Sequence, residues 1–124
     1  KDVTFTYPDA DLPVLSDINC VAEPGQTTAF IGSTGSGKST LINLIPRFYD
    51  VSAGQILLDG VDIRNLKLED LSGQIGYVPQ KGVLFSGTVA SNIKYGNAEA
   101  SDKLVEKAAK IAQAEEFISE LKNG

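Results

Sequence analysis

The feature that most constrains this chain is a glycine-rich stretch, GSTGSGKST, at residues 32–40. It fits the pattern G-x-x-x-x-G-K-[ST], which is typical of a loop that wraps around phosphate groups. An apolar run, TTAFIG at 27–32, precedes it, and STLINLI at 39–45 follows it with the apolar spacing of a helix. A strand, a glycine turn and a helix in that order predict an α/β fold.

The residue types of this loop suit the chemistry of a nucleotide's phosphates. Gly35 and Gly37 let backbone N–H groups turn inward, and a helix starting at Lys38 directs its first amides at the same anion. Lys38 brings positive charge to the β- and γ-phosphates, the Ser39 hydroxyl is suited to Mg²⁺, and Thr40 adds a hydroxyl near the α-phosphate. A flexible loop without a ligand is the alternative. The predicted phosphate-binding set is Ser33, Thr34, Gly35, Ser36, Gly37, Lys38, Ser39 and Thr40.

Composition excludes several other functions. Eleven basic residues against sixteen acidic ones give a net charge of −5, which argues against a nucleic-acid partner. With no histidine, these residues offer no histidine base or zinc ligand. The one cysteine, Cys20, alternates with Ile18 in an apolar run, so we expect a buried strand residue. A chain without an initiator Met suggests a piece cut from something longer.

Alternation and turn signals predict strands in the first eighty residues. GQILLDGVDI at 54–63 predicts two short strands joined by a DG turn. The helix of 39–45 is expected to end near Pro46. Further strands are expected within VTFTY (3–7), VLSDINCVA (14–22), TTAFIG (27–32) and IGYVPQ (75–80), the last two as buried core strands.

Beyond Ser86 the pattern changes to helices. SGTVASNIKYG (86–96) predicts a short helix, SDKLVEKAAKIAQA (101–114) a longer one with Ser101 as N-cap, and EEFISELK (115–122) a third. The apolar face of the longer helix is predicted to consist of Leu104, Val105, Ala108, Ile111 and Ala112.

Four stretches make the chain resemble the N-terminal part of the nucleotide-binding (ATPase) domain of an ATP-binding cassette (ABC) transporter of the exporter type. They are VTFTYPDADLPVLSDI, GSTGSGKSTLINLIPRFYDVSAGQILLDGVDI, IGYVPQ and VLFSGTVASNI, in the family's order and spacing. The resemblance implies a partial P-loop NTPase core with an antiparallel β-subdomain over residues 1–80. It implies the Q-loop and the start of a helical subdomain, truncated, over residues 81–124.

The resemblance also assigns roles outside the glycine-rich loop. Tyr7 matches the aromatic residue that stacks on adenine, although it could be an ordinary half-exposed strand tyrosine. Gln80 matches the Q-loop glutamine, which contacts Mg²⁺ and the attacking water; the alternative is a plain loop glutamine. Residues 81–92 match the surface that receives the transporter's transmembrane domain, or are ordinary surface. ATP and Mg²⁺ are the implied cofactors, with Ser39 and Gln80 as metal ligands.

Two stretches imitate other family motifs and are interpreted as structural. LSGQ at 71–74 lacks one glycine of the signature LSGGQ and precedes Gln80 instead of following it. We interpret it as a turn after a short helix in LKLEDL (66–71), with Gly73 ending that helix. ILLD at 56–59 is followed by Gly60 where Walker B of the family has glutamate, so we interpret it as the first half of the DG hairpin.

The resemblance implies that the full-length protein hydrolyses ATP to power export at the cytoplasmic face of the cell membrane. A transmembrane domain and a second nucleotide-binding domain are the implied partners. No catalytic residue is assigned, because Walker B, the signature and the switch histidine are absent, so we predict that this piece binds Mg-ATP without hydrolysing it. The alternatives are a non-catalytic nucleotide-binding module and an importer ATPase. A small kinase or GTPase is disfavoured, since Arg47 and Arg64 are the only arginines and N-K-x-D is missing.

Overall fold

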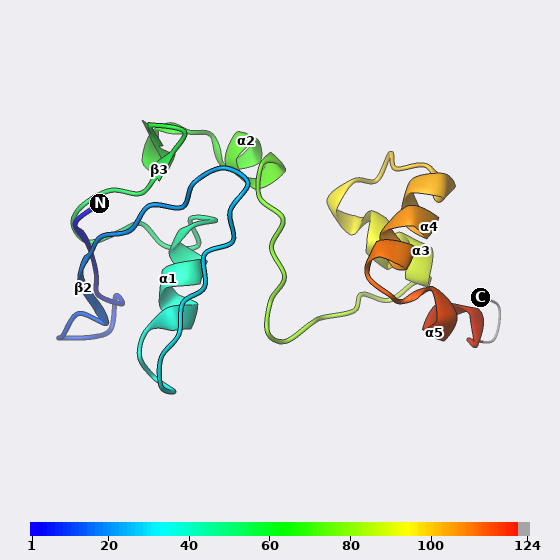
Figure 1. Cartoon of the computed structure of the whole chain (residues 1–124), viewed down its shortest axis with the longest axis horizontal. Helices are drawn as coiled ribbons and strands as arrows, with labels where there is room; N and C mark the ends of the chain where they lie inside the picture. The colour runs from blue at the N-terminus through cyan, green and yellow to red at the C-terminus, as the bar shows by residue number, and fades with distance from the viewer. Residues whose placement is uncertain (122–124) are drawn as a thin grey trace. The chain divides into compact units, whose positions relative to one another are not determined.

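A computed structural model of the chain describes residues 1–121. The chain divides into two compact units, one up to Val78 and one from Pro79 onward, and each is described by itself. Figure 1 draws both units along the chain, with labels on their main helices and strands. None of the helices described is long and apolar enough to cross a bilayer.

A two-stranded antiparallel sheet organises the first unit. Strand β1 (Val3–Phe5) pairs with β2 (Leu15–Ile18), so that Val3 lies opposite Ile18 and Phe5 opposite Leu15. Thr4 extends the contacts of β1 on its other side, because its N–H donates to the carbonyl of Ala53 at 3.0 Å. The predicted strands in 3–7 and 14–22 are confirmed, each over a shorter span.

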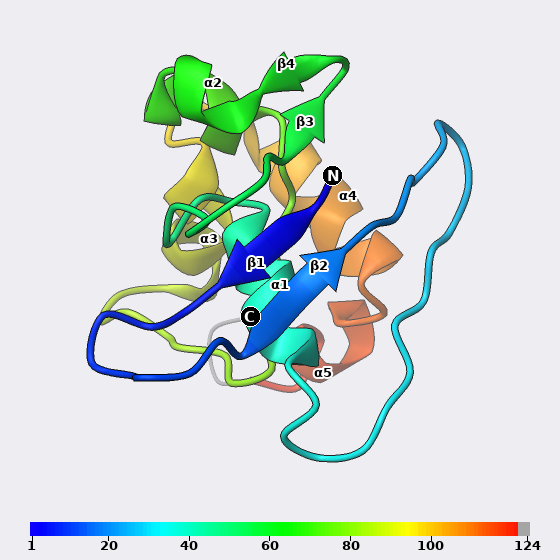
Figure 2. The ribbon, with the colours of Figure 1, turned by 90° about the vertical axis from the view of Figure 1, so that its left-hand side faces the viewer.

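Helix α1 (Lys38–Leu44) covers this sheet. Its last residue, Leu44, is completely buried and joins Val3, Phe5 and Leu15 in one hydrophobic cluster. Figure 2 shows β1 and β2 side by side with α1 lying behind them. The helix ends before Pro46, as the restriction on the residue before proline predicts.

A hairpin follows, made of β3 (Leu57–Leu58) and β4 (Val61–Asp62). Its two turn residues, Asp59 (φ 49°) and Gly60 (φ 83°), both have positive φ, as a type I′ turn requires. The DG turn is thereby confirmed. The short 3₁₀ helix η1 (Ile63–Asn65) and helix α2 (Leu68–Gly73) complete the unit.

The prediction of two buried core strands is wrong. Residues 27–32 and 75–80 have no strand structure, and nearly all are exposed; Ile31 is 96% and Val78 92% exposed. A strand exists only where a neighbour pairs with it, and neither run has a pairing partner among residues 1–121. Cys20 is exposed and lies beyond the end of β2, which corrects the prediction of a buried strand residue.

The second unit is helical, as predicted. Helix α3 (Val89–Ile93) begins with a capping box between Thr88 and Ser91 and continues into the 3₁₀ helix η2 (Lys94–Gly96). Helices α4 (Asp102–Ile111) and α5 (Glu115–Ser119) follow.

Two details of the second unit differ from expectation. The buried residue of α4 is Ala109, while Leu104 is 53% and Ile111 72% exposed, so the buried side is turned from the predicted face toward Val105 and Ala109. Ser101 is the N-cap residue of α4, yet its side chain makes no capping hydrogen bond. Lys122, the last residue of the predicted third helix, lies outside the described residues.

Candidate functional site

The glycine-rich loop is fixed where it enters α1. Gly37 is the N-cap residue of the helix, with φ 87°, and no side chain caps the helix there. A Cβ at Gly37 would lie 2.7 Å from Cδ2 of Leu15, so β2 and the loop approach each other too closely for any side chain. Gly35 also has a positive φ, 81°, but a Cβ there would meet open space.

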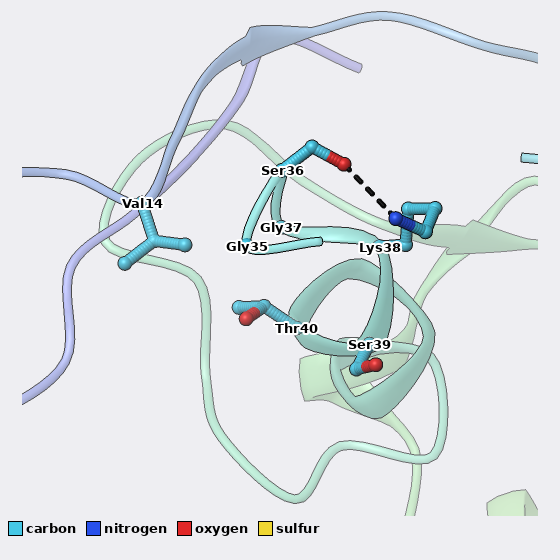
Figure 3. A pocket seen from close by; sticks show the side chains of 7 residues that line it. All are labelled: Val14, Gly35, Ser36, Gly37, Lys38, Ser39 and Thr40. Carbon is cyan, nitrogen blue, oxygen red and sulfur yellow. Dashed lines mark hydrogen bonds between the residues drawn. The ribbon is translucent and has the colours of Figure 1, made fainter. Parts of the chain in front are cut away.

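Lys38 folds back over the loop that precedes it. Its Nζ donates to the carbonyl oxygens of Gly32 at 2.8 Å and Ser33 at 2.6 Å, and to Oγ of Ser36 at 3.2 Å. Figure 3 shows the Lys38 ammonium and the Ser36 hydroxyl joined above the start of α1. A positive charge is thus held inside a turn of polar residues.

A small open pocket of about 160 Å³ lies against this loop. Figure 3 shows the Val14 side chain facing the loop from the segment before β2. Sequence reasoning missed Val14, because an apolar residue beside a strand carries no chemical signal. The pocket is lined by Val14, Gly35, Ser36, Gly37, Lys38, Ser39 and Thr40.

Tyr7 lies next to the start of α1. Its hydroxyl oxygen is 3.0 Å from Oγ1 of Thr40, a hydrogen bond in which either group can donate. The Tyr7 ring packs edge-on against Phe5, with centroids 4.9 Å apart, and against Tyr49, at 5.3 Å. The structure therefore brings Tyr7 together with one residue of the glycine-rich loop motif.

The remaining predicted site residues are exposed or belong to the second unit. Ser33, Thr34 and Ser39 are exposed on the loop and the first turn of α1. Gln80 belongs to the second unit, so its contact with Mg²⁺ stays a prediction.

The later part of the segment 81–92 makes hydrogen bonds within itself and packs on Tyr95. The N–H of Phe85 donates to Oδ1 of Asn92 at 2.7 Å, and Nδ2 of Asn92 donates back to the Phe85 carbonyl at 2.9 Å. The Phe85 ring stacks on Tyr95 with centroids 4.2 Å apart. Docking of a transmembrane domain on this segment stays a prediction.

LSGQ at 71–74 belongs to the end of α2. Leu71 is buried, and the Ser72 hydroxyl donates to the carbonyl of Glu69 at 3.1 Å. Gly73 is the last residue of the helix, as predicted, but an irregular segment follows where a strand was expected.

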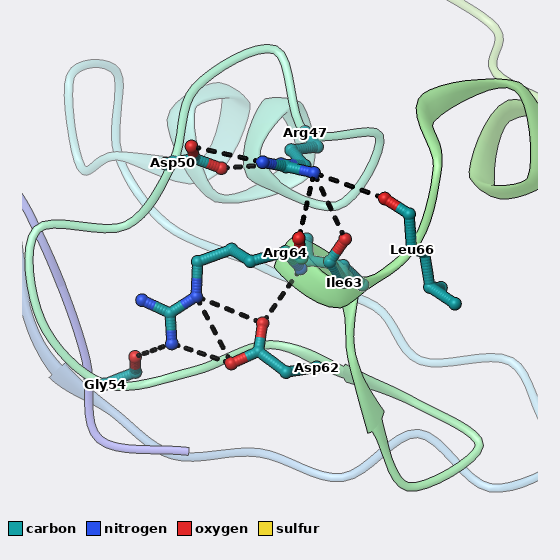
Figure 4. Close-up of polar contacts among 7 residues, drawn as sticks. All are labelled: Arg47, Asp50, Gly54, Asp62, Ile63, Arg64 and Leu66. Carbon is teal, nitrogen blue, oxygen red and sulfur yellow. Dashed lines mark hydrogen bonds and ion pairs between the residues drawn. The ribbon is translucent and has the colours of Figure 1, made fainter.

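Two arginine–aspartate pairs connect the segment that follows α1 with β4 and η1 (Figure 4). Arg47 binds Asp50 at 2.7 Å, and its guanidinium also donates to backbone carbonyls within η1 and at its C-terminal end. Arg64 binds Asp62 at 2.7 Å and donates to the Gly54 carbonyl at 3.0 Å. Hydrogen bonds from the Arg64 side chain lower the pKa of Asp62, and a hydrogen bond from the Arg64 backbone N–H adds a smaller contribution. A hydrogen bond from Arg47 lowers the pKa of Asp50.

The pocket's donor set suits an anion. One ammonium group and three hydroxyls line it, together with the start of a helix, whose first N–H groups have no partner within the helix. None of its lining residues carries a carboxylate. Leu15 fills the space where a side chain of Gly37 would stand, whereas the corresponding space at Gly35 is open and leaves room for a ligand. These groups fit the phosphates of a nucleotide.

Comparison with known proteins gives a family match. The family model described as ABC transporter matches residues 15–124. An uncharacterized ABC transporter ATP-binding protein of Mycobacterium tuberculosis is 52% identical over 118 residues, which cover 93% of this chain and 20% of that protein. A putative multidrug export ATP-binding/permease protein of Staphylococcus aureus is 52% identical over 122 residues, covering 98% of this chain and 21% of that protein. The chain thus spans about a fifth of the length of these relatives.

Proposed function

Because the chain belongs to the ABC transporter family, whose ATPase domains have a P-loop and bind ATP, we propose that residues 33–40 hold the phosphates of Mg-ATP. The observation that carries this proposal is the position of Lys38. Its ammonium group is held by two backbone carbonyls and one hydroxyl of the loop, and the space beside Gly35 in the same loop is open.

Each residue has a definite part in this proposal. Lys38 binds the β- and γ-phosphates, and the backbone from Gly35 to Thr40 surrounds them with N–H groups. The Ser39 hydroxyl is a Mg²⁺ ligand, with Gln80 as a second one. Tyr7 offers its ring to the adenine base. Bound ATP supplies a transferable phosphoryl group.

For the whole protein we propose the ATPase part of an exporter. The Staphylococcus aureus relative is named as a putative multidrug export ATP-binding/permease protein. This name supports a role in export over a role in import. Residues 81–92 would then contact a transmembrane domain at the cytoplasmic face of the membrane, and a second nucleotide-binding domain would face the ATP site.

The 124-residue chain by itself is proposed to bind ATP without hydrolysing it. Hydrolysis needs a group that positions or polarises water, and charge stabilisation beyond the loop. No carboxylate lines the pocket to act on water. This favours the second candidate, a nucleotide-binding module, as the behaviour of the isolated chain. Release of inorganic phosphate from Mg-ATP by this chain would contradict it.

Replacing Lys38 tests the site. Lys38→Ala should weaken Mg-ATP binding by about 10- to 100-fold, because hydrogen bonds from a charged donor each contribute about 1.5–3 kcal/mol. Isothermal titration calorimetry measures the affinity, and Lys103→Ala on the exposed side of α4 is the control that should leave it unchanged. Unchanged ATP affinity in Lys38→Ala would show that the nucleotide binds elsewhere.

A further inference from the structure

We propose that Tyr49 is a positioning residue for the Tyr7 ring, and that the edge-on contact between the two rings presents Tyr7 to the base of a nucleotide. This inference rests on the proposed function, in which Tyr7 offers its ring to adenine. Tyr49 comes from the segment that follows α1, outside the glycine-rich motif.

The backbone around Tyr7 leaves the direction of its ring to neighbouring side chains. Strand β1 ends at Phe5, so Tyr7 lies beyond the last residue that pairs with β2. Its carbonyl accepts a hydrogen bond of 3.0 Å from the N–H of Ala10, in the turn that follows the strand. Tyr7 is partly buried against the hydrophobic cluster of the first unit, and contacts made there set the orientation of its ring.

The Tyr7 side chain contacts two aromatic rings and one hydroxyl among the described residues. Its ring is nearly perpendicular to Phe5, at 79° with centroids 4.9 Å apart, and to Tyr49, at 87° and 5.3 Å. Its hydroxyl oxygen is 3.0 Å from Oγ1 of Thr40. Because the Thr40 hydroxyl is expected near the α-phosphate, a bound nucleotide can replace that hydrogen bond. The aromatic contacts do not compete with a phosphate.

The Tyr49 ring is itself placed by its surroundings. Arg47 binds Asp50 at 2.7 Å, and this ion pair brackets Tyr49 in the chain (Figure 4). The Tyr49 ring also packs against Phe5, with centroids 5.6 Å apart. Phe5 is 2% exposed and belongs to the core, whereas Tyr49 is 41% exposed. The contact between Tyr49 and Tyr7 can therefore be altered without emptying the core.

An edge-on pair of rings has a preferred orientation, because the positive edge of one ring is attracted to the negative face of the other. Tyr49 therefore limits the tilt of the Tyr7 ring before a ligand arrives. A ring whose orientation is fixed in advance loses less entropy when a base stacks on it. The expected consequence is a higher affinity for ligands that carry a base, with no change in affinity for phosphates alone.

The experiment compares Mg-ATP with inorganic tripolyphosphate, which has the phosphates of ATP and no base, on variants of the 124-residue chain. Tyr49→Leu should lower Mg-ATP affinity by about 2- to 10-fold, the size of one edge-on aromatic pair, and leave tripolyphosphate affinity unchanged. Tyr49→Phe keeps the ring and should bind both ligands as the unaltered chain does. Isothermal titration calorimetry measures the affinities.

Phe48→Leu is the matched control for Tyr49→Leu. Phe48 is the preceding residue, but its ring packs edge-on against Tyr77, with centroids 5.3 Å apart. Its replacement should change neither affinity. A loss of Mg-ATP affinity in Phe48→Leu equal to that in Tyr49→Leu would overturn the inference, because the effect would then belong to the segment and not to the contact with Tyr7.

A double variant separates positioning from direct contact with the ligand. In Tyr7→Leu the base loses its stacking ring, so adding Tyr49→Leu should weaken Mg-ATP binding no further. If the two losses multiply instead, Tyr49 touches the ligand itself and is not a positioning residue.

A measurement on the unaltered chain needs no substitution. Nuclear Overhauser effects between the ring protons of Tyr7 and Tyr49 should be present without ligand and should remain when Mg-ATP is bound. Their loss on binding would overturn the inference. This measurement also decides the matter if urea unfolding shows that Tyr49→Leu does not fold.

The outcomes distinguish this inference from the proposed function. If Tyr7→Leu weakens Mg-ATP binding and a folded Tyr49→Leu does not, the inference fails and the base surface stands. Equal weakening of Mg-ATP and tripolyphosphate in a folded Tyr49→Leu also overturns the inference. If Tyr7→Leu has no effect, the base surface fails and the inference fails with it. If Lys38→Ala changes neither ligand, the phosphate site is wrong, while the Mg-ATP results at Tyr7 and Tyr49 still decide the inference.

Discussion

The strands that formed in the first unit differ from the apolar runs that did not. β1 and β2 are neighbours in sequence, and β3 and β4 meet across a two-residue turn. The runs 27–32 and 75–80 are separated by α1, the β3–β4 hairpin and α2, and neither is paired. Antiparallel neighbours find each other through a short loop, whereas parallel strands depend on partners beyond a crossover.

The same difference is found on the two sides of the glycine-rich loop. One side continues into a packed element, and the other continues from one of the unpaired runs. Toward the C-terminus it enters α1, which packs by Leu44 on β1 and β2, and Gly37 contacts Leu15. Toward the N-terminus it continues from the exposed segment 27–32. The loop is therefore anchored by its helical side.

The largest expected effect contrasts these two flanks. Leu44→Ala should lower the free energy of unfolding by about 2–5 kcal/mol, or abolish cooperative unfolding, because Leu44 is completely buried. Ile31→Ala, at a residue 96% exposed, should change it by less than about 0.5 kcal/mol. Urea unfolding followed by circular dichroism measures both. A cost for Ile31→Ala close to that of Leu44→Ala would mean that 27–32 is a packed strand after all.

Sequence reasoning succeeded where the signal is local. The DG pair predicted the hairpin, because positive φ at Asp59 and Gly60 belongs to the turn itself. The loop motif predicted a helix from Lys38, and proline predicted its end. These features need only residues a few positions apart.

It failed where the outcome depends on distant partners. An apolar β-rich run such as TTAFIG indicates that the residues would suit a buried strand. It does not indicate whether neighbouring strands exist to pair with it and bury it. Cys20 was misplaced for the same reason, since its strand stops at Ile18. In the site, the Lys38 position follows from the motif, while the Tyr7–Thr40 hydrogen bond joins residues 33 positions apart and has no sequence signature.

A smaller effect on stability is expected from substitutions at two glycines of the loop. It compares Gly37, which lies against Leu15, with Gly35, which faces open space. Gly37→Ala combines a positive φ with a clash against Leu15, so it should lower the free energy of unfolding by about 2–4 kcal/mol. Gly35→Ala meets only the backbone strain and should cost about 1–2 kcal/mol. Urea unfolding of the two variants tests the order. Equal costs would contradict the anchoring of the loop by Gly37.

The smallest expected effect is on the pH dependence of unfolding. It tests whether an ion pair helps to hold the paired β3–β4 hairpin, which the unpaired runs lack a counterpart to. The pKa of Asp62, on β4, lies below its ordinary value of 3.8 because the Arg64 side chain donates hydrogen bonds to it. A carboxyl whose pKa is lower in the folded state stabilises that state above the unfolded pKa, and this stabilisation is lost as the pH falls through the folded pKa. Stability should therefore fall below about pH 4, and the fall should be shallower in Asp62→Asn, which keeps an acceptor for the Arg64 N–H but not the charge.

Urea midpoints at pH 7 and pH 3 measure this fall, with Asp9→Asn in the exposed turn after β1 as the matched control. The fall should not vanish in Asp62→Asn, because Arg47 also lowers the pKa of Asp50. An acid limb equally steep in Asp62→Asn and the unaltered chain would mean that the Asp62–Arg64 pair does not distinguish the folded hairpin from the unfolded chain. The hairpin would then owe its pairing to the DG turn and to the burial of Ile63 beside it, without help from charge.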